Sequence, residues 1–225
     1  MEILLDSGDP SEIREVAATG LIRGVTTNPS VYARAVRDGD FLTRLRELVD
    51  ASPGYLFTQV IGIQDADSMA GQARWLAKQS DKVVVKLPVT RAGLAALTLL
   101  KREDPGIRLA VTGVGSIAQA LLAGVAGADV VALFNGPLDL ESDTPVEIVA
   151  PVKQMYAHSG IETKVLSCAR FPRSAGQYAA AGSDMITLRK EYFDLLYEHP
   201  YTDKRLNGFM SDWATAFRGE TWPRA

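Results

Sequence analysis

The chain has 225 residues, of which 47% are hydrophobic and 23% are charged, and its formal net charge at pH 7 is −3. This composition is typical of a globular protein, and no basic tract points to a nucleic-acid or membrane partner. The single cysteine, Cys168, excludes an intrachain disulfide, and two histidines disfavour a conventional zinc site. Without a signal-peptide pattern or an apolar run of ~20 residues, we expect a cytoplasmic protein.

Short apolar segments that predict strands alternate along the chain with segments of helical periodicity. The expected strands are, in order, Glu2–Asp6, Arg23–Thr27, Tyr55–Val60, Lys82–Lys86, Ile107–Thr112, Asp129–Phe134, Glu162–Ser167 and Asp184–Leu188. The expected helices are Pro10–Ala18, Pro29–Val36, Phe41–Val49, Ala66–Gln79, Arg91–Lys101, Ser116–Ala126, Pro145–Ala157, Pro172–Ala181 and Glu191–Tyr197. Asp9 and Asn28, each followed by proline, and Thr90 are typical residues at a helix start.

Eight strand–helix units indicate a parallel sheet that closes as a single-domain (β/α)8 TIM barrel. An open doubly wound sheet is the alternative, but the glycine-rich phosphate loop usual after its first strand is missing. A further helix is expected at Thr202–Arg218, after the eighth unit. We expect residues 1–200 to form the barrel, and residues 201–225 to add a helix and tail to the same domain, packed on it or on a neighbouring subunit.

Polar residues end almost every expected strand, and active sites of such barrels lie at the carboxyl ends of the strands. A single polar residue at the end of a strand usually marks the point where the chain leaves the interior for solvent. Polar residues at the ends of most of the eight strands together favour a functional site. These residues are Asp6, Thr26, Thr27, Asn28, Gln59, Lys86, Thr112, Asn135, Ser167, Cys168 and Thr187.

Lys86 follows three valines at the end of an expected interior strand. Desolvation lowers the pKa of a buried lysine, and the neutral amine forms Schiff bases with carbonyl compounds. The alternative is an amine that reaches solvent or pairs with a carboxylate. The polar neighbours favour the Schiff-base interpretation, so that a carbon–carbon bond beta to the imine can break or form.

Aldol chemistry through an imine needs further groups, and the strand ends supply them. Asp6 can move a proton at the substrate hydroxyl, although an Asx turn is an alternative role. Gln59 and Thr112 can hold the water that hydrates the imine, and the Asn28 amide can orient hydroxyl groups.

The sequence resembles the transaldolase family, most closely its small members and the related fructose-6-phosphate aldolases, from residue 2 to about Trp213. The motifs are LLDSGD, GVTTNPS at Gly24–Ser30, VVVKLPVTRAGLAAL at Val83–Leu97 and TGVGSIAQALLAGVAGADVVALF at Thr112–Phe134. The resemblance implies class I aldol chemistry without metal or organic cofactor, with Lys86 as the Schiff-base lysine and Asp6 as the acid/base. It implies Thr112 and Gln59 at the catalytic water, and substrate binding by Asn28, Thr27, Ala132, Phe134, Ser167 and Arg170.

Three positions distinguish transfer from free aldol cleavage within the resemblance. Transaldolases carry Phe as at Phe134, where the aldolases carry Tyr, and we weight this residue most. Gln59 and Ala132 resemble the aldolase branch, since many transaldolases have Glu and Ser there.

The phosphate positions depart from the family pattern. Pro137 stands where the family usually has arginine, and Cys168 stands where it often has serine, whereas Arg170 is retained. Without a bidentate guanidinium at position 137 a strong phosphate contact is missing. Either Arg170 and Arg173 hold the phosphate differently, or the acceptor is not a common sugar phosphate, and we expect an altered acceptor range. Cys168 is expected to be a packing residue, since no histidine is near it in sequence.

Three functions are compared on these residues. The leading one is a transaldolase that moves a dihydroxyacetone unit from a ketose phosphate to an aldehyde through Lys86. The second is an aldolase that uses or releases free dihydroxyacetone, and the third is a non-catalytic sugar-binding barrel. The resemblance also implies a homo-oligomer, a decamer of two pentameric rings, with sugar phosphates as the small-molecule partners.

Overall fold

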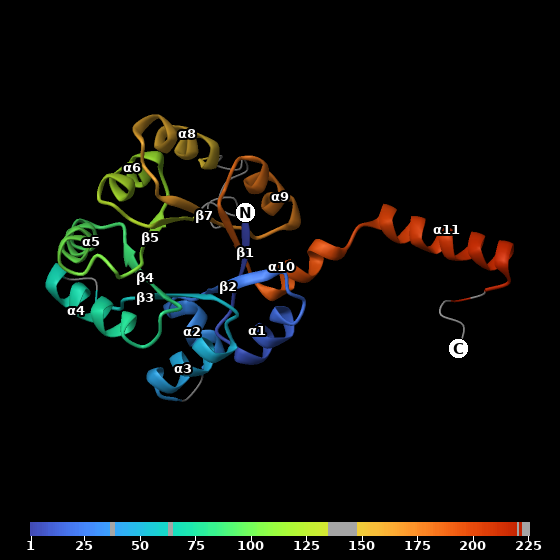
Figure 1. Ribbon diagram of the computed structural model, residues 1–225, viewed down its shortest axis with the longest axis horizontal. Helices are drawn as coiled ribbons and strands as arrows, with labels where there is room; N and C mark the ends of the chain where they lie inside the picture. The colour runs from blue at the N-terminus through green and yellow to red at the C-terminus, as the bar shows by residue number, and fades with distance from the viewer. Residues whose placement is uncertain (37–38, 63–64, 135–147, 220, 222–225) are drawn as a thin grey trace.

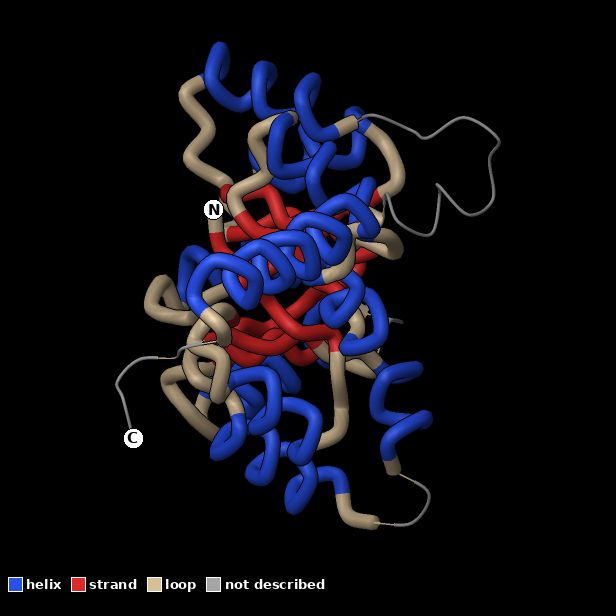
Figure 2. Tube along the Cα trace, turned by 90° about the vertical axis from the view of Figure 1, so that its right-hand side faces the viewer, coloured by secondary structure: helices blue, strands red, loops and turns tan. Residues whose placement is uncertain are grey.

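The computed structural model describes residues 1–36, 39–62, 65–134, 148–219 and 221. Eight parallel strands close into a barrel in which each strand pairs with the next in the chain and β8 pairs with β1. The strands are β1 Glu2–Asp6, β2 Ile22–Thr26, β3 Tyr55–Gln59, β4 Val83–Pro88, β5 Leu109–Val114, β6 Val130–Leu133, β7 Lys164–Cys168 and β8 Met185–Leu188. The predicted (β/α)8 barrel is confirmed, and Figure 2 shows the strands enclosed by helices.

The helices form the outer layer, and side-chain caps begin several of them. Their bounds are α1 Pro10–Ala17, α2 Pro29–Ala35, α3 Phe41–Ala51, α4 Ala66–Ala77, α5 Arg91–Glu103, α6 Ile117–Val125, α8 Val149–Ser159, α9 Pro172–Ala180, α10 Lys190–Asp194 and α11 Pro200–Phe217. Asp9, Asn28 and Thr90 accept hydrogen bonds from backbone N–H groups of α1, α2 and α5. These side chains satisfy donors that the first helical turn leaves unpaired.

Successive side chains of a strand point to opposite faces, and this alternation divides the apolar core into two layers. Leu5, Val25 and Val85 belong to the layer between the barrel and its helices. A smaller cluster contains the alternate strand residues and fills the barrel interior: Leu4, Phe57, Val84, Ala110, Val130, Ala132, Leu166 and Met185. The same alternation continues to the carboxyl ends of the strands, where it selects the residues that face the barrel mouth.

A repeated ion pair ties helices to strands at the amino end of the barrel. Lys101 of α5 contacts Asp129 at 2.7 Å, and Asp129 also accepts a hydrogen bond from the Leu109 backbone at the start of β5. Lys153 of α8 contacts Asp184 at 2.8 Å, and Asp184 accepts from the Val165 backbone in β7. Each aspartate therefore holds the start of one strand against a helix. Both ion pairs lie at the amino end of the barrel, opposite the carboxyl ends of the strands.

Several element bounds differ from the sequence prediction. β4 continues to Pro88 rather than ending at Lys86, because Leu87 and Pro88 still pair with β5, although the pairing with β3 ends at Lys86. The expected helix Glu191–Tyr197 divides into α10 and a 3-10 turn, Leu195–Tyr197. The start expected for a helix at Pro145 lies outside the described residues, within which α8 begins at Val149.

The last helix, α11, begins two residues before the expected start, at Pro200. Figure 1 shows it extending away from the barrel, and none of its described residues is buried. Leu206, Phe209 and Met210 are each more than half exposed. Within the described part of the chain, no helix combines the length and apolarity needed to cross a membrane.

Candidate active site

A cavity of about 480 Å³ opens at the carboxyl ends of the strands. Residues from all eight strands or from the segments that follow them line it, together with α2. The lining residues are Asp6, Thr26, Asn28, Pro29, Ser30, Arg34, Gln59, Lys86, Thr112, Ala132, Phe134, Leu166, Cys168, Arg170, Thr187 and Arg189. Eight of the ten residues proposed from the sequence as site residues are in this set.

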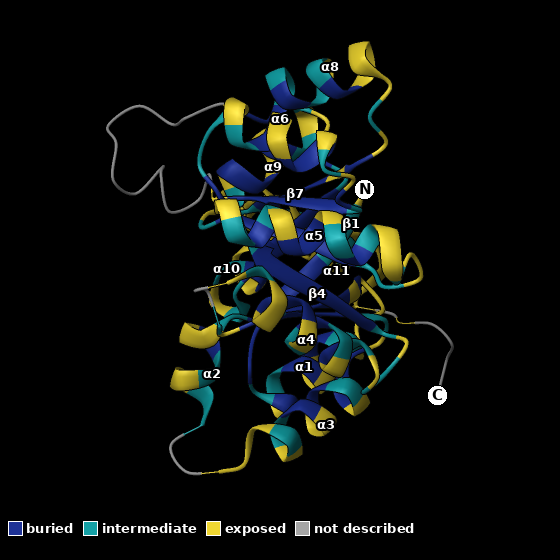
Figure 3. Cartoon of the chain, turned by 90° about the vertical axis from the view of Figure 1, so that its left-hand side faces the viewer, coloured by how far each residue is buried: buried dark blue, intermediate teal, exposed yellow. Residues whose placement is uncertain are grey.

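Lys86 is 5% exposed, inside β4, the strand that appears buried along its length in Figure 3. Its backbone lies beside Gln59 of β3 and Ala110 of β5. Burial lowers the pKa of the Lys86 amine below its ordinary value of 10.5, although the nearby charge of Asp6 opposes this shift. A larger share of Lys86 is therefore present as the neutral, nucleophilic amine than for a lysine in water.

Asp6 ends β1 at the same mouth and accepts a hydrogen bond from one threonine, which a second threonine contacts in turn. The Thr26 hydroxyl donates to Asp6 Oδ1 at 3.0 Å and lies 2.7 Å from the Thr187 hydroxyl. Because Thr26 uses its proton on Asp6, Thr187 is the donor in the second bond. The two hydroxyls, from β8 and β2, thus fix the position of the Asp6 side chain at the end of β1, where it lines the cavity.

Three further side chains that line the cavity have the chemistry expected from the sequence. The Asn28 carbonyl oxygen accepts from the Val31 backbone at 2.9 Å, which leaves the amide NH₂ available to a ligand. Gln59 is paired in register with Lys86, and Thr112 is 4% exposed on β5. These residues surround the amine with neutral hydrogen-bonding groups that could hold water or a substrate hydroxyl.

Phe134, Ala132 and Cys168 form the less polar part of the wall. Phe134 is 39% exposed, and it brings no hydroxyl to the cavity. Burial raises the pKa of the Cys168 thiol to about 11, with a further contribution from the charge of Asp6. The thiol is therefore protonated at neutral pH, which agrees with a wall residue rather than a nucleophile.

Thr27 and Ser167 are predicted from the sequence to bind substrate, but neither is among the residues that line this cavity. The Thr27 hydroxyl donates to the Phe57 carbonyl oxygen at 2.8 Å, and the Ser167 hydroxyl lies 2.9 Å from that of Ser183. Both are fully buried. The period of two explains this placement, since their neighbours Thr26 and Cys168 face the barrel interior.

The sequence interpretation missed two arginines of the wall. Arg34 belongs to α2, and Arg189 follows β8 directly. The alternation in β8 could have identified Arg189, because Met185 and Thr187 face the interior and Arg189 is the next residue of the same parity. Nothing in the local sequence pattern of α2 distinguishes Arg34 from an ordinary solvent-exposed arginine.

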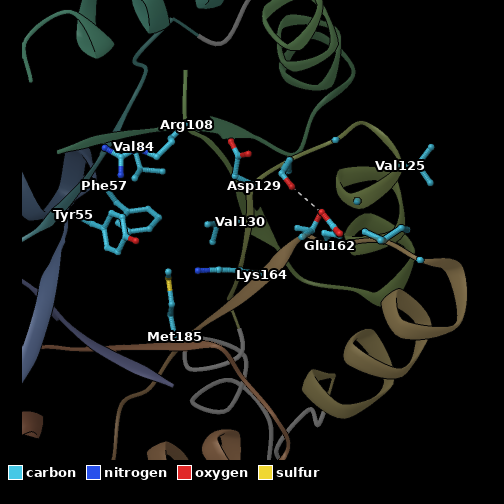
Figure 4. A pocket seen from close by; sticks show the side chains of 16 residues that line it. Tyr55, Phe57, Val84, Arg108, Val125, Asp129, Val130, Glu162, Lys164 and Met185 are labelled. Carbon is cyan, nitrogen blue, oxygen red and sulfur yellow. Dashed lines mark hydrogen bonds between the residues drawn. The ribbon is translucent and has the colours of Figure 1, made fainter. Parts of the chain in front are cut away.

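A larger cavity, of about 680 Å³, lies at the opposite end of the barrel. Figure 4 shows Tyr55, Lys164 and Met185 directed into it from the first residues of their strands, and Phe57 from the third residue of β3. The guanidinium of Arg108 lies 5.4 Å from the centre of the Tyr55 ring. Lys86, Asp6 and their polar neighbours all belong to the other end, so the smaller cavity is the one with the elements of an aldol site.

Comparisons with known proteins identify the family of the chain. Residues 3–220 match the family described as transaldolase/fructose-6-phosphate aldolase. A probable transaldolase of Desulfitobacterium hafniense is 40% identical over 214 residues, which cover 95% of this chain and 98% of the relative. Probable transaldolases of Methanococcus maripaludis and Caulobacter vibrioides are 37% and 38% identical, covering 95% and 96% of this chain and 97% of each relative. The chain therefore belongs to the transaldolase/fructose-6-phosphate aldolase family.

Proposed function

We propose that this protein is a transaldolase that transfers a dihydroxyacetone unit from a ketose phosphate to an aldehyde acceptor through a Schiff base on Lys86. The observation that carries the proposal is a lysine amine, 5% exposed and with a lowered pKa, in the same cavity as a hydrogen-bonded carboxylate. A non-catalytic sugar-binding barrel needs neither feature. The family membership and the names of the relatives support the same reaction class.

The reaction would begin with attack of the neutral Lys86 amine on the ketose carbonyl carbon, followed by loss of water to give an iminium. Asp6 would accept the proton of the hydroxyl on the carbon beyond the bond that breaks, and that carbon would leave as an aldehyde. The bonding electrons pass to the iminium nitrogen, which leaves an enamine on Lys86. Attack of the enamine on a second aldehyde, protonation by Asp6 and hydrolysis of the imine would release the new ketose.

Borohydride trapping tests the covalent step. Incubation with fructose 6-phosphate and borohydride should add one reduced adduct, located by peptide mass spectrometry on Lys86, and Lys86→Met should give none. Lys78→Met is the matched control, since Lys78 is exposed at the end of α4. An active chain without an adduct on Lys86 would rule out the Schiff-base proposal.

The main alternative is an aldolase that releases free dihydroxyacetone. Gln59 beside Lys86 favours this alternative, because a neutral amide cannot act as a carboxylate base. Phe134 favours transfer, because without a hydroxyl to position the hydrolytic water the enamine persists until an acceptor arrives. We weight Phe134 more, since the missing hydroxyl acts on the step that separates the two reactions.

Product analysis with and without an acceptor aldehyde separates the two reactions. We expect Phe134→Tyr to increase the release of dihydroxyacetone in the absence of acceptor, severalfold relative to transfer. Phe41→Tyr, on an exposed ring of α3 outside the cavity, is the control and should leave the ratio unchanged. Rapid release by the unmodified chain without acceptor would instead support the aldolase.

We further propose that the acceptor range differs from that of a standard transaldolase, because proline at position 137 and cysteine at position 168 cannot make two phosphate contacts expected there. Pro137 lies outside the described residues, whereas Cys168 lines the cavity. A matrix of phosphorylated and unphosphorylated aldehydes, read by mass spectrometry, tests this range. If this protein and its relatives showed the same preference for every aldehyde in the matrix, the proposal of a different acceptor range would be contradicted.

A further inference from the structure

Two guanidinium groups in the cavity have buried nitrogen atoms without a partner among the described residues. Arg170 Nε and Arg189 Nε are each buried, and neither makes a hydrogen bond to the described part of the chain. Burying such a donor without a partner is costly, and buried polar atoms of this kind usually have a role that the protein alone does not show. Both residues line the cavity that contains Lys86, so a ligand there could satisfy them.

The charges of this wall favour an anion. Among the described residues that line the cavity, Arg34, Arg170 and Arg189 bring three guanidinium groups, and Asp6 is the one carboxylate. In the part of the chain that the structure describes, Arg189 has one ion pair, a long contact of 3.6 Å to Glu191, and Arg34 and Arg170 have none. The positive charge is therefore largely uncompensated by the described side chains.

The positions of these arginines around the barrel set them apart from Lys86. Arg170 follows β7, Arg189 follows β8, and Arg34 lies in α2, so all three belong to one side of the ring of strands. Lys86 lies in β4, which is four strands from β8 in either direction. Arg189 and Lys86 thus lie on opposite walls of the same cavity, which suits a ligand with a carbonyl at one end and an anion at the other.

We propose that Arg34 and Arg189, which lie outside the phosphate positions of the family pattern, bind the phosphate monoester of the sugar substrate beside Arg170, the contact that the resemblance already implies. A guanidinium offers paired donors that match phosphate oxygens. In transfer of a dihydroxyacetone unit, the three carbons on Lys86 have no phosphate, so the aldehyde fragment carries it. One anion site at the β8 side would then serve donor and acceptor alike. It would hold the phosphate at a different place from positions 137 and 168, in agreement with an altered acceptor range. Calling the anion a substrate phosphate rests on the proposed function.

The anion site can be tested without catalysis by binding inorganic phosphate to Lys86→Met, which cannot form an imine. Adding Arg189→Gln or Arg34→Gln should weaken phosphate binding about tenfold or more, because each removes a charge-assisted contact. Arg46→Gln is the matched control, since Arg46 is exposed on α3 and outside the cavity. Circular dichroism checks that each variant is folded, and Arg34, being exposed, is a safe second site. Unchanged phosphate binding in both cavity variants would overturn the proposal.

Trapping then separates the anion site from the proposed function. With Lys86 intact, Arg189→Gln and Arg34→Gln should raise the half-saturating concentration of fructose 6-phosphate for adduct formation about tenfold and leave that of unphosphorylated fructose unchanged. Equal losses with both sugars would contradict a phosphate contact even if adducts form. Absence of any adduct, with phosphate binding still dependent on Arg189, would refute the Schiff base and leave the anion site standing.

Discussion

The amine of Lys86 illustrates how one position in a strand sets the chemistry of a residue. Val84 and Lys86 both face the barrel interior, but Val84 lies in the apolar layer and Lys86 lies two residues nearer the carboxyl end. At that level it meets Asp6 and the polar residues of its neighbours. Burial depresses the pKa of the amine, and this shift links the proposed reactivity to a cost in folding free energy.

Lys86→Met should therefore stabilise the protein near neutral pH. In the native chain the Lys86 pKa is lowered, so below that value both folded and unfolded states carry the charge and the cost is complete. As pH rises through the lowered pKa toward 10.5, the folded state binds fewer protons than the unfolded state, and stability increases until the cost is gone. We expect Lys86→Met to raise the free energy of unfolding by about 1 kcal/mol or more at pH 7.

Urea unfolding of both chains from about pH 7 to pH 10.5 measures this difference, which should shrink as the pH rises. Lys78→Met, on an exposed lysine, should change stability by less than about 0.5 kcal/mol at pH 7. A variant that is less stable than the parent chain at pH 7, with a difference independent of pH, would show that Lys86 is not penalised by burial.

The element that presents Lys86 depends on a close approach between β4 and α5. The Gly93 backbone N–H donates to the Thr90 cap, and a Cβ at Gly93 would collide with the Pro88 carbonyl oxygen. Because that oxygen belongs to backbone, the clash cannot be relieved by a side-chain rotation. The end of β4, and with it the cavity wall beyond Lys86, is thus packed directly against the first turn of α5.

Gly93→Ala should destabilise the protein by about 1–3 kcal/mol, because the backbone at the end of β4 must shift. A second glycine provides the control: Gly71 in α4 has nothing within 4 Å of its would-be Cβ. Gly71→Ala should stabilise the protein by about 0.4–1 kcal/mol through lower chain entropy and better helix propensity. Thermal unfolding of both variants measures the contrast, and a Gly93→Ala chain as stable as Gly71→Ala would exclude the close approach.

In the whole molecule, α11 extends away from the barrel, and none of its described residues is buried (Figure 1). Its apolar side chains include Phe209 and Met210, which are 52% and 66% exposed. Helices of this length owe most of their stability in proteins to tertiary contacts. A second copy of the chain is the partner that we propose for this helix, in agreement with the ring-shaped assemblies that the family resemblance implies.

Native mass spectrometry should therefore show a homo-oligomer, with a decamer as the expected state. Replacing Phe209 and Met210 together by aspartate should reduce the assembly to smaller species, because two charges would enter the proposed interface. Lys204→Asp, on the same helix, is the control, because it makes the charge more negative by two, as the two aspartates do, and keeps the apolar side chains. The proposal would be contradicted if the parent chain were monomeric at micromolar concentration. It would also be contradicted if the aspartate variant remained a decamer.

The sequence by itself determined the alternation of strands and helices, and from it the barrel, because apolar periodicity of two and of 3.6 residues records which face of each element is buried. It also placed Asp6 and Lys86 at the carboxyl ends of their strands with side chains toward the barrel interior, because each lies two residues after an interior residue. Thr27 and Ser167 also stand at strand ends, but they point away from the barrel interior and do not line the cavity, so their part in substrate binding stays a prediction. In β8, the same rule that every second residue faces the interior would have added Arg189 to the predicted site.

Which residues meet at the carboxyl ends of the strands depends on the tertiary structure. Closure of β8 on β1 brings Thr187 to Thr26, 161 positions away, and it sets Arg189 opposite Lys86. The position of Arg34 on the cavity wall likewise depends on how α2 is docked. No local sequence pattern predicts that these residues are neighbours, because the free energy that brings them together comes from long-range packing of the barrel. Local periodicity fixes the direction of a side chain, whereas only closure fixes what it faces.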